Sequence, residues 1–224
     1  MESSSTRTRR TDFILLLTPA AACVAIPGPG VILAALIVVT VLIVRRDVRG
    51  AVLRLWWRGP MSSIALGIAA GVAVVMLDAS VIEPLVQHFI HSQPNVGALG
   101  TIQGNLPAYL RLLGIALVIG GIAEELVFRG FLIGWSCRLM GEQTVLPAMV
   151  LSSALFGFSH LYQGLAGVVE TGIIGVLLAT LYVGVGRRLL PGSFAHMTID
   201  AFGITELYTN GAITHFVAHL LGRV

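Results

Sequence analysis

The 224-residue sequence has little charge: 11% of its residues are charged, whereas 56% are hydrophobic. A soluble domain carries about a quarter charged residues, so this composition excludes an ordinary soluble protein. The mean hydropathy is +0.90, and apolar runs long enough to cross a bilayer recur along the chain. No polar stretch is long enough to form a second, soluble domain. The sequence therefore predicts an all-α fold, a polytopic transmembrane helix bundle in a lipid bilayer.

Lysine is absent, and all 14 basic residues are arginine. The sequence pI near 9.3 does not predict a nucleic-acid partner, because the arginines lie at the ends of apolar segments rather than on one face. This placement is typical of the positive charge that membrane proteins keep in the cytoplasm. The arginine-only usage is typical of a GC-rich bacterial genome. We expect an integral protein of a bacterial cytoplasmic membrane, with its N-terminus in the cytoplasm.

Cysteine is also scarce, and Cys23 and Cys137 lie in different apolar segments. No disulfide framework is therefore predicted. The basic and then apolar start of the chain resembles a signal peptide. Another apolar run follows at once after Pro27-Gly28-Pro29-Gly30, which favours an uncleaved first membrane helix. The first two runs are short, so a re-entrant hairpin is an alternative to two full spans.

About seven membrane helices are expected, at residues 12–26, 31–44, 61–82, 108–139, 145–162, 165–186 and 191–208. We divide the chain into N-terminal membrane helices and loops (1–107), a helix core (108–208) and an interfacial C-terminal tail (209–224). The loop 45–60 is basic and contains Trp56 and Trp57, so it is expected in the cytoplasm. The segment 84–107 has no Arg or Lys and is expected to be an outside loop.

The stretch "GIAEELVFRG" (121–130) places three ionisable residues inside an apolar run. Such groups are costly in a membrane helix and usually face a cavity or a partner. Glu125 and Arg129 are spaced i and i+4 with the acid first, which favours an ion pair. Glu124 is rotated by about 100° from Glu125 and has no basic residue at i+4, where Phe128 stands. Glu124 is thus the unpaired carboxylate and the candidate general base.

Three further ionisable residues, His160, His196 and Asp200, lie inside apolar segments. Counted along ideal helices from the arginine-rich ends, they and Glu124 lie at depths of roughly 12 to 25 Å, so they are expected to meet near mid-membrane. A carboxylate and two histidines suit water activation and oxyanion stabilisation. The alternative is a buried polar network that only fastens helices together.

Other acidic and histidine residues have simpler interpretations. Solvation or pairing with Arg111 is expected to explain the acids near the outer helix ends, and His215 and His219 are expected to be solvated on the tail. Those acids are Asp78, Glu83, Glu170 and Glu206.

Three motifs resemble one family: "EELVFR" (Glu124 to Arg129), "FGFSH" (Phe156 to His160) and "HMTID" (His196 to Asp200). They follow the pattern E-E-x-x-x-R, F-x-x-x-H and H-x-x-x-N/D of the CAAX-protease and bacteriocin-processing (CPBP, or Abi) intramembrane proteases. The match covers about residues 108 to 208.

The resemblance implies a glutamate-dependent endopeptidase in which Glu124 and His160 activate water, and His196 and Asp200 bind the oxyanion. Glu125, Arg129 and Phe156 are the supporting residues. No cofactor is expected; zinc is the alternative, although the chain contains no H-E-x-x-H motif. Asp200 stands where the pattern often has asparagine, and an ionised Asp cannot donate a hydrogen bond to an oxyanion.

We therefore expect a peptide or membrane-protein substrate, cut near the cytoplasmic membrane surface. One alternative is a non-catalytic protein that binds, or confers immunity to, a peptide. Another is a proton-coupled transporter, since buried Glu and His serve proton relays. Transport is disfavoured because the sequence has neither an inverted repeat nor paired broken helices.

Overall fold

The computed structural model describes residues 4–213, with side chains described from residue 11 onward apart from Ala98. Within this part of the chain the protein forms eight continuous helices and no strand. The first three are α1 (Ser4–Ala25), α2 (Gly30–Val44) and α3 (Arg46–Val52). Two long helices follow, each built from several segments: α4 (Pro60–Leu77), η1 (Asp78–Ile82) and α5 (Glu83–Ile90), then α6 (Leu106–Val118), η3 (Ile119–Trp135) and α7 (Ser136–Met140). The last three are α8 (Val145–Ser159), α9 (Gly164–Gly184) and α10 (Leu189–Thr209).

Three of these helices are long and apolar enough to cross a membrane, and two shorter apolar helices precede them. The long ones are Pro60–Ile90, Leu106–Met140 and Leu161–Gly184, and the shorter ones are Thr11–Ala25 and Gly30–Val44. Many of the large apolar side chains on the bundle surface are exposed, as expected of helices that face lipid rather than water. The protein is thus an integral membrane helix bundle, and the predicted fold class is confirmed.

Several predicted boundaries are wrong. The basic loop 45–60 contains the helix α3, whose Val48 and Val52 are buried. The helix expected to end at residue 82 continues as α5 to Ile90, so the first part of the expected outside loop is helical. The helix expected at 145–162 ends at Ser159 and leaves His160 as its C-cap. Most of the predicted interfacial tail, with His215 and His219, lies outside the described residues.

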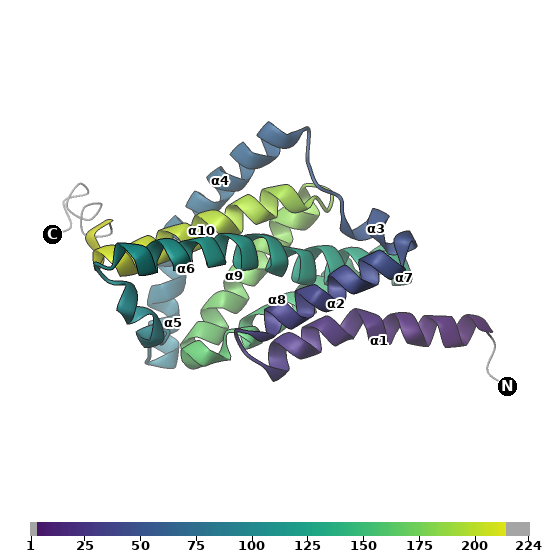
Figure 1. Ribbon diagram of the computed structural model, residues 1–224, viewed down its shortest axis with the longest axis horizontal. Helices are drawn as coiled ribbons and strands as arrows, with labels where there is room; N and C mark the ends of the chain where they lie inside the picture. The colour runs from purple at the N-terminus through teal and green to yellow at the C-terminus, as the bar shows by residue number, and fades with distance from the viewer. Residues whose placement is uncertain (1–3, 214–224) are drawn as a thin grey trace.

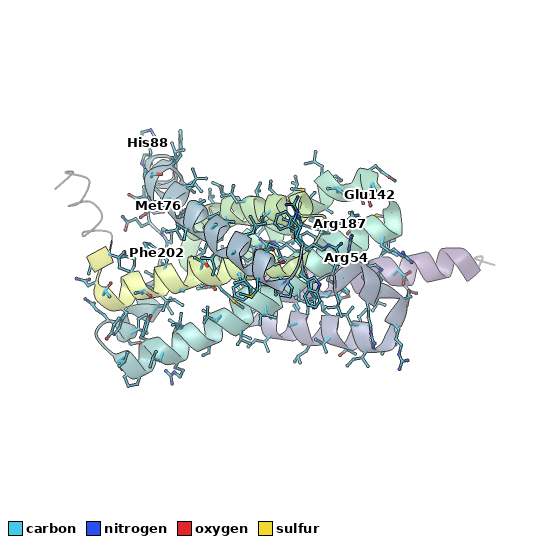
Figure 2. All side chains as sticks on the ribbon, turned by 90° about the horizontal axis from the view of Figure 1, so that it is seen from above. Arg54, Met76, His88, Glu142, Arg187 and Phe202 are labelled. Carbon is cyan, nitrogen blue, oxygen red and sulfur yellow. The ribbon has the colours of Figure 1, made fainter. Side chains whose placement is uncertain are left out.

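One end of the bundle gathers the arginine-rich turns, and we call it the basic end. The backbone N–H of Leu189 donates a hydrogen bond of 2.8 Å to the carbonyl of Arg54. The guanidinium of Arg187 donates two hydrogen bonds, of 2.8 and 2.7 Å, to the carboxylate of Glu142 and holds the pKa of that carboxyl below its usual range. Figure 2 shows Arg54, Glu142 and Arg187 together at this end of the molecule. The basic end comprises residues 45–59, 138–144 and 185–188.

The other end, which we call the distal end, holds the remaining turns. In Figure 1 it is the side of α5 and of the last turn of α10, away from α3 and α7. Backbone hydrogen bonds join its turns: Gly28 N–H to Ser159 O at 2.9 Å, Asn95 N–H to Gln163 O at 2.8 Å, and Gly104 N–H to Tyr208 O at 3.1 Å. The helices between the two ends therefore run alternately from one end to the other.

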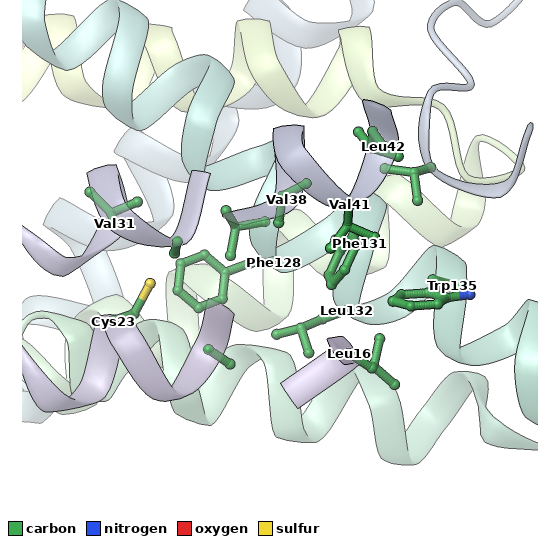
Figure 3. Packing of buried hydrophobic residues seen from close by; sticks show 14 of the residues in the cluster. Leu16, Cys23, Val31, Val38, Val41, Leu42, Phe128, Phe131, Leu132 and Trp135 are labelled. Carbon is green, nitrogen blue, oxygen red and sulfur yellow. The ribbon is translucent and has the colours of Figure 1, made fainter. Parts of the chain in front are cut away.

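The largest apolar core lies where the N-terminal helices pack on η3. Phe128, Phe131 and Trp135 of η3 contact buried residues of α1 and α2 (Figure 3). Phe128 and Phe131 are fully buried, and in a bilayer such contacts stabilise the bundle through close van der Waals packing rather than through removal of apolar surface from water. The helices α1, α2 and α3 thus hold in place the segment that carries the two glutamates.

Candidate active site

The four predicted catalytic residues line one cavity of about 690 Å³. Glu124 comes from η3, His160 from the end of α8, and His196 and Asp200 from α10. The structure thus brings together residues from three helices that are up to 76 positions apart in the sequence (124 to 200). Their roles in catalysis stay predictions, but their convergence on one cavity is a property of the fold.

The predicted ion pair between Glu125 and Arg129 is present and buried. Arg129 Nη1 lies 3.0 Å from Glu125 Oε1, and both residues have 0% exposure. A second guanidinium nitrogen, Nη2, donates to the carbonyl of Gly175 on α9 at 3.2 Å. The guanidinium also lies over the ring of Phe156, 4.6 Å from its centroid, a cation–π geometry. Arg129 therefore links η3 to both α8 and α9.

His196 occupies the centre of the polar cluster. Its Nδ1 lies 2.9 Å from Glu125 Oε1, and because a carboxylate accepts, Nδ1 carries the proton. Its Nε2 lies 3.6 Å from Glu124 Oε2 and 3.8 Å from Asp200 Oδ1. The two adjacent glutamates therefore contact different nitrogens of one imidazole. Glu125 orients the ring, and Glu124 faces the nitrogen that points to the cavity.

His160 is oriented by its own helix. Its Nδ1 lies 2.9 Å from the carbonyl of Phe156 and 3.1 Å from Ser159 Oγ. A carbonyl only accepts, so Nδ1 donates and Nε2 keeps its lone pair. The ring of Phe156 contacts the rings of His160 and His196 at centroid distances of 4.9 and 5.6 Å. Phe156 therefore packs against both histidines and keeps their rings apart, in keeping with its predicted supporting role.

The segment Ile119–Trp135 forms π-type rather than α-type hydrogen bonds. π geometry is rare and occurs mostly as single turns at functional sites. The membrane depth of Glu124 and its rotation relative to Glu125 were predicted for an α-helix. Neither value holds in detail along this π-type segment. Gly120 and Gly121 allow α10 to approach this segment closely. A Cβ on Gly120 would overlap Asp200 Oδ2, and one on Gly121 would overlap Met197 Cγ.

Sequence reasoning missed several other residues of the cavity. Tyr162 and Gln163, in the turn after His160, also line it. So do the four acids assigned to solvent or to Arg111, namely Asp78, Glu83, Glu170 and Glu206. Among the described residues, Arg111 forms no ion pair with Asp78, Glu83 or Glu170. These acids could have been predicted to lie together, because they all stand near the distal ends of their helices and such ends meet in space.

A metal ion does not fit the described residues as they stand. Within residues 4–213, no group of three or more His, Cys, Asp or Glu side chains is placed to hold one. The effect of a chelator on activity tests the zinc alternative.

Comparison with known proteins gives one finding. The family model for "Type II CAAX prenyl endopeptidase Rce1-like" matches residues 106–202. No curated protein and no solved structure matches the chain. The matched segment contains all three motifs and every predicted catalytic residue, so the resemblance drawn from the sequence is confirmed. Residues 106–202 of this membrane helix bundle are thus similar to the Rce1-like family of type II CAAX prenyl endopeptidases.

Proposed function

We propose that the protein is an intramembrane endopeptidase that hydrolyses a peptide bond of a membrane-associated peptide or protein. The observation that carries this proposal is that Glu124, His160, His196 and Asp200 line one cavity inside a bundle of apolar helices. The family match supports the reaction class.

Glu124 is the general base in this proposal. It is 9% exposed and lines the cavity, whereas Glu125 is occupied by Arg129 and His196. A water between Glu124 and His160 donates one proton to the Glu124 carboxylate and one hydrogen bond to His160 Nε2. The water oxygen then attacks the carbonyl carbon of the scissile bond.

His196 and Asp200 stabilise the oxyanion that forms. With Nδ1–H held by Glu125, His196 presents Nε2–H to the oxyanion when the ring is an imidazolium, and the surrounding carboxylates offset that charge. Asp200 donates a hydrogen bond when protonated and orients His196 when ionised. The carbon–nitrogen bond then breaks, and protonated Glu124 returns its proton to the leaving amine, so a carboxylic acid and an amine are released.

The test is cleavage of a peptide library by purified protein. We expect Glu124→Gln to abolish cleavage while the protein still inserts and folds, because an amide cannot take the proton from water. Glu142→Gln, at the exposed basic end, is the matched control and should keep activity. Full activity in Glu124→Gln would contradict the assignment. Peptide binding without cleavage by the wild type would instead favour the peptide-binding or immunity alternative.

A further inference from the structure

The cavity extends from the middle of the bundle to its distal end. Besides the four proposed catalytic residues, its wall includes the α1–α2 turn at Gly28, the segment before α6, the turn after α8 and the last turns of α10. None of its lining residues belongs to the basic end as defined by residues 45–59, 138–144 and 185–188. The site was expected to serve the cytoplasmic surface, and the position of this cavity does not agree with that expectation.

Exposure along the wall shows where the cavity opens. Glu124 and His196, at its inner part, are 9% and 4% exposed. Tyr162, in the distal turn between α8 and α9, is 51% exposed, and Gln93, in the distal segment after α5, is also exposed. The cavity therefore opens among residues of the distal end.

The distribution of charge indicates which side of the membrane this is. Eight arginines lie in the basic end: Arg45, Arg46, Arg49, Arg54, Arg58, Arg138, Arg187 and Arg188. Arginine concentrates on the cytoplasmic side of membrane proteins, so the basic end is the cytoplasmic one. Among the described residues no arginine lines the cavity, whereas six acids do: Asp78, Glu83, Glu124, Glu170, Asp200 and Glu206. The distal end has Arg111, near the start of α6, whereas the basic end has eight arginines.

We propose that the peptide substrate enters from the side of the membrane opposite the cytoplasm. The proposal rests on the proposed function and specifies its substrate class. That class is a secreted peptide, or the outward-facing juxtamembrane segment of a membrane protein. A peptide confined to the cytoplasmic surface would meet the arginine turns and the packed core of α3 and η3 instead of the cavity.

The first test is orientation in intact cells. In a full-length background with Cys23→Ala and Cys137→Ala, a membrane-impermeant maleimide should label Gln93→Cys, at the cavity opening, and should leave Arg46→Cys unlabelled. His88 is exposed on the distal side and does not line the cavity, so His88→Cys is a matched control and should label like Gln93→Cys. Outside labelling of Arg46→Cys but not Gln93→Cys would overturn the proposal.

The second test connects orientation to cleavage. Proteoliposomes holding each cysteine variant are treated with a bulky impermeant maleimide and then given an impermeant peptide that the detergent-solubilised wild type cleaves. Blocking Gln93→Cys should abolish cleavage of the external peptide, whereas blocking Arg46→Cys or His88→Cys should not. Loss of cleavage on blocking Arg46→Cys alone would show entry from the basic end. Absence of cleavage by the detergent-solubilised wild type would instead contradict the proposed function.

Discussion

Replacing Arg129 by methionine tests how strongly the buried ion pair holds the site together. Arg129 and Glu125 have 0% exposure, and the pair distance is 3.0 Å. The same guanidinium bonds to Gly175 on α9 and lies over Phe156 on α8. Methionine has a similar apolar stem but no charge. Arg129→Met therefore leaves the Glu125 carboxylate buried with only His196 as a polar partner.

The expected loss of folding free energy is about 3–5 kcal/mol, the cost of stranding one partner of a buried pair. This loss lowers the folding equilibrium constant by roughly two to four orders of magnitude. The double variant Glu125→Gln/Arg129→Met should be more stable than Arg129→Met alone. It contains no uncompensated charge, and the glutamine oxygen still accepts from His196 Nδ1.

The measurement is reversible unfolding of the purified variants in bilayers or bicelles, analysed as a double-mutant cycle. Arg187→Met is the control, because Arg187 pairs with an exposed carboxylate at the basic end, and only a minor change is expected there. A loss below about 1 kcal/mol for Arg129→Met, the range of surface pairs, would refute the reasoning. So would a double variant that is less stable than either single one.

Three further predictions concern the cavity. Asp200→Asn should keep much of the peptidase activity. Asp200→Leu should lose activity on the order of a hundredfold or more, the scale of one missing oxyanion donor. A wild type that a chelator inhibits, with an inactive Asn variant that added metal restores, would favour the zinc alternative instead. Gly120→Ala should lower kcat because its Cβ displaces the Asp200 carboxylate. The Cβ of Gly121→Ala meets Met197 and the backbone carbonyl of Ser193 rather than a proposed catalytic side chain, so it should affect kcat less at equal thermal stability. Among peptides in a library, those with lysine near the scissile bond should be cut faster than those with glutamate, and the difference should shrink as salt is raised.

The sequence predicted the membrane helices well because long apolar runs carry a strong signal. The second helix, expected at 31–44, is observed at Gly30–Val44. The hydrophobic pattern did not predict burial where a side chain is buried only because another helix packs on it. Val48 and Val52 stand among arginines in sequence, and they are buried because α3 packs on η3 near Gly130. Periodicity within a short polar stretch cannot reveal such a contact.

The candidate site was predictable to the extent that its residues interact within one helix. The i, i+4 spacing of Glu125 and Arg129 predicted their ion pair correctly. The spacing could not show that Glu125 also holds Nδ1 of His196, 71 positions away. Nor could it show that the acids of the distal helix ends share the cavity, because that depends on how the helices are arranged in space.

The difference between the two adjacent glutamates follows from their positions on η3. Glu125 faces α10 and Arg129, and a Cβ on Gly192 of α10 would contact its Oε2, so it is enclosed and has no room for a substrate. Glu124, one position earlier, reaches the cavity and faces the other nitrogen of the same histidine. One imidazole thus couples a carboxylate fixed by an arginine to a carboxylate open to water. Because that arrangement requires α10 to approach η3 closely at Gly120, Gly121 and Gly192, the catalytic roles proposed here depend on three glycines as much as on the charged residues.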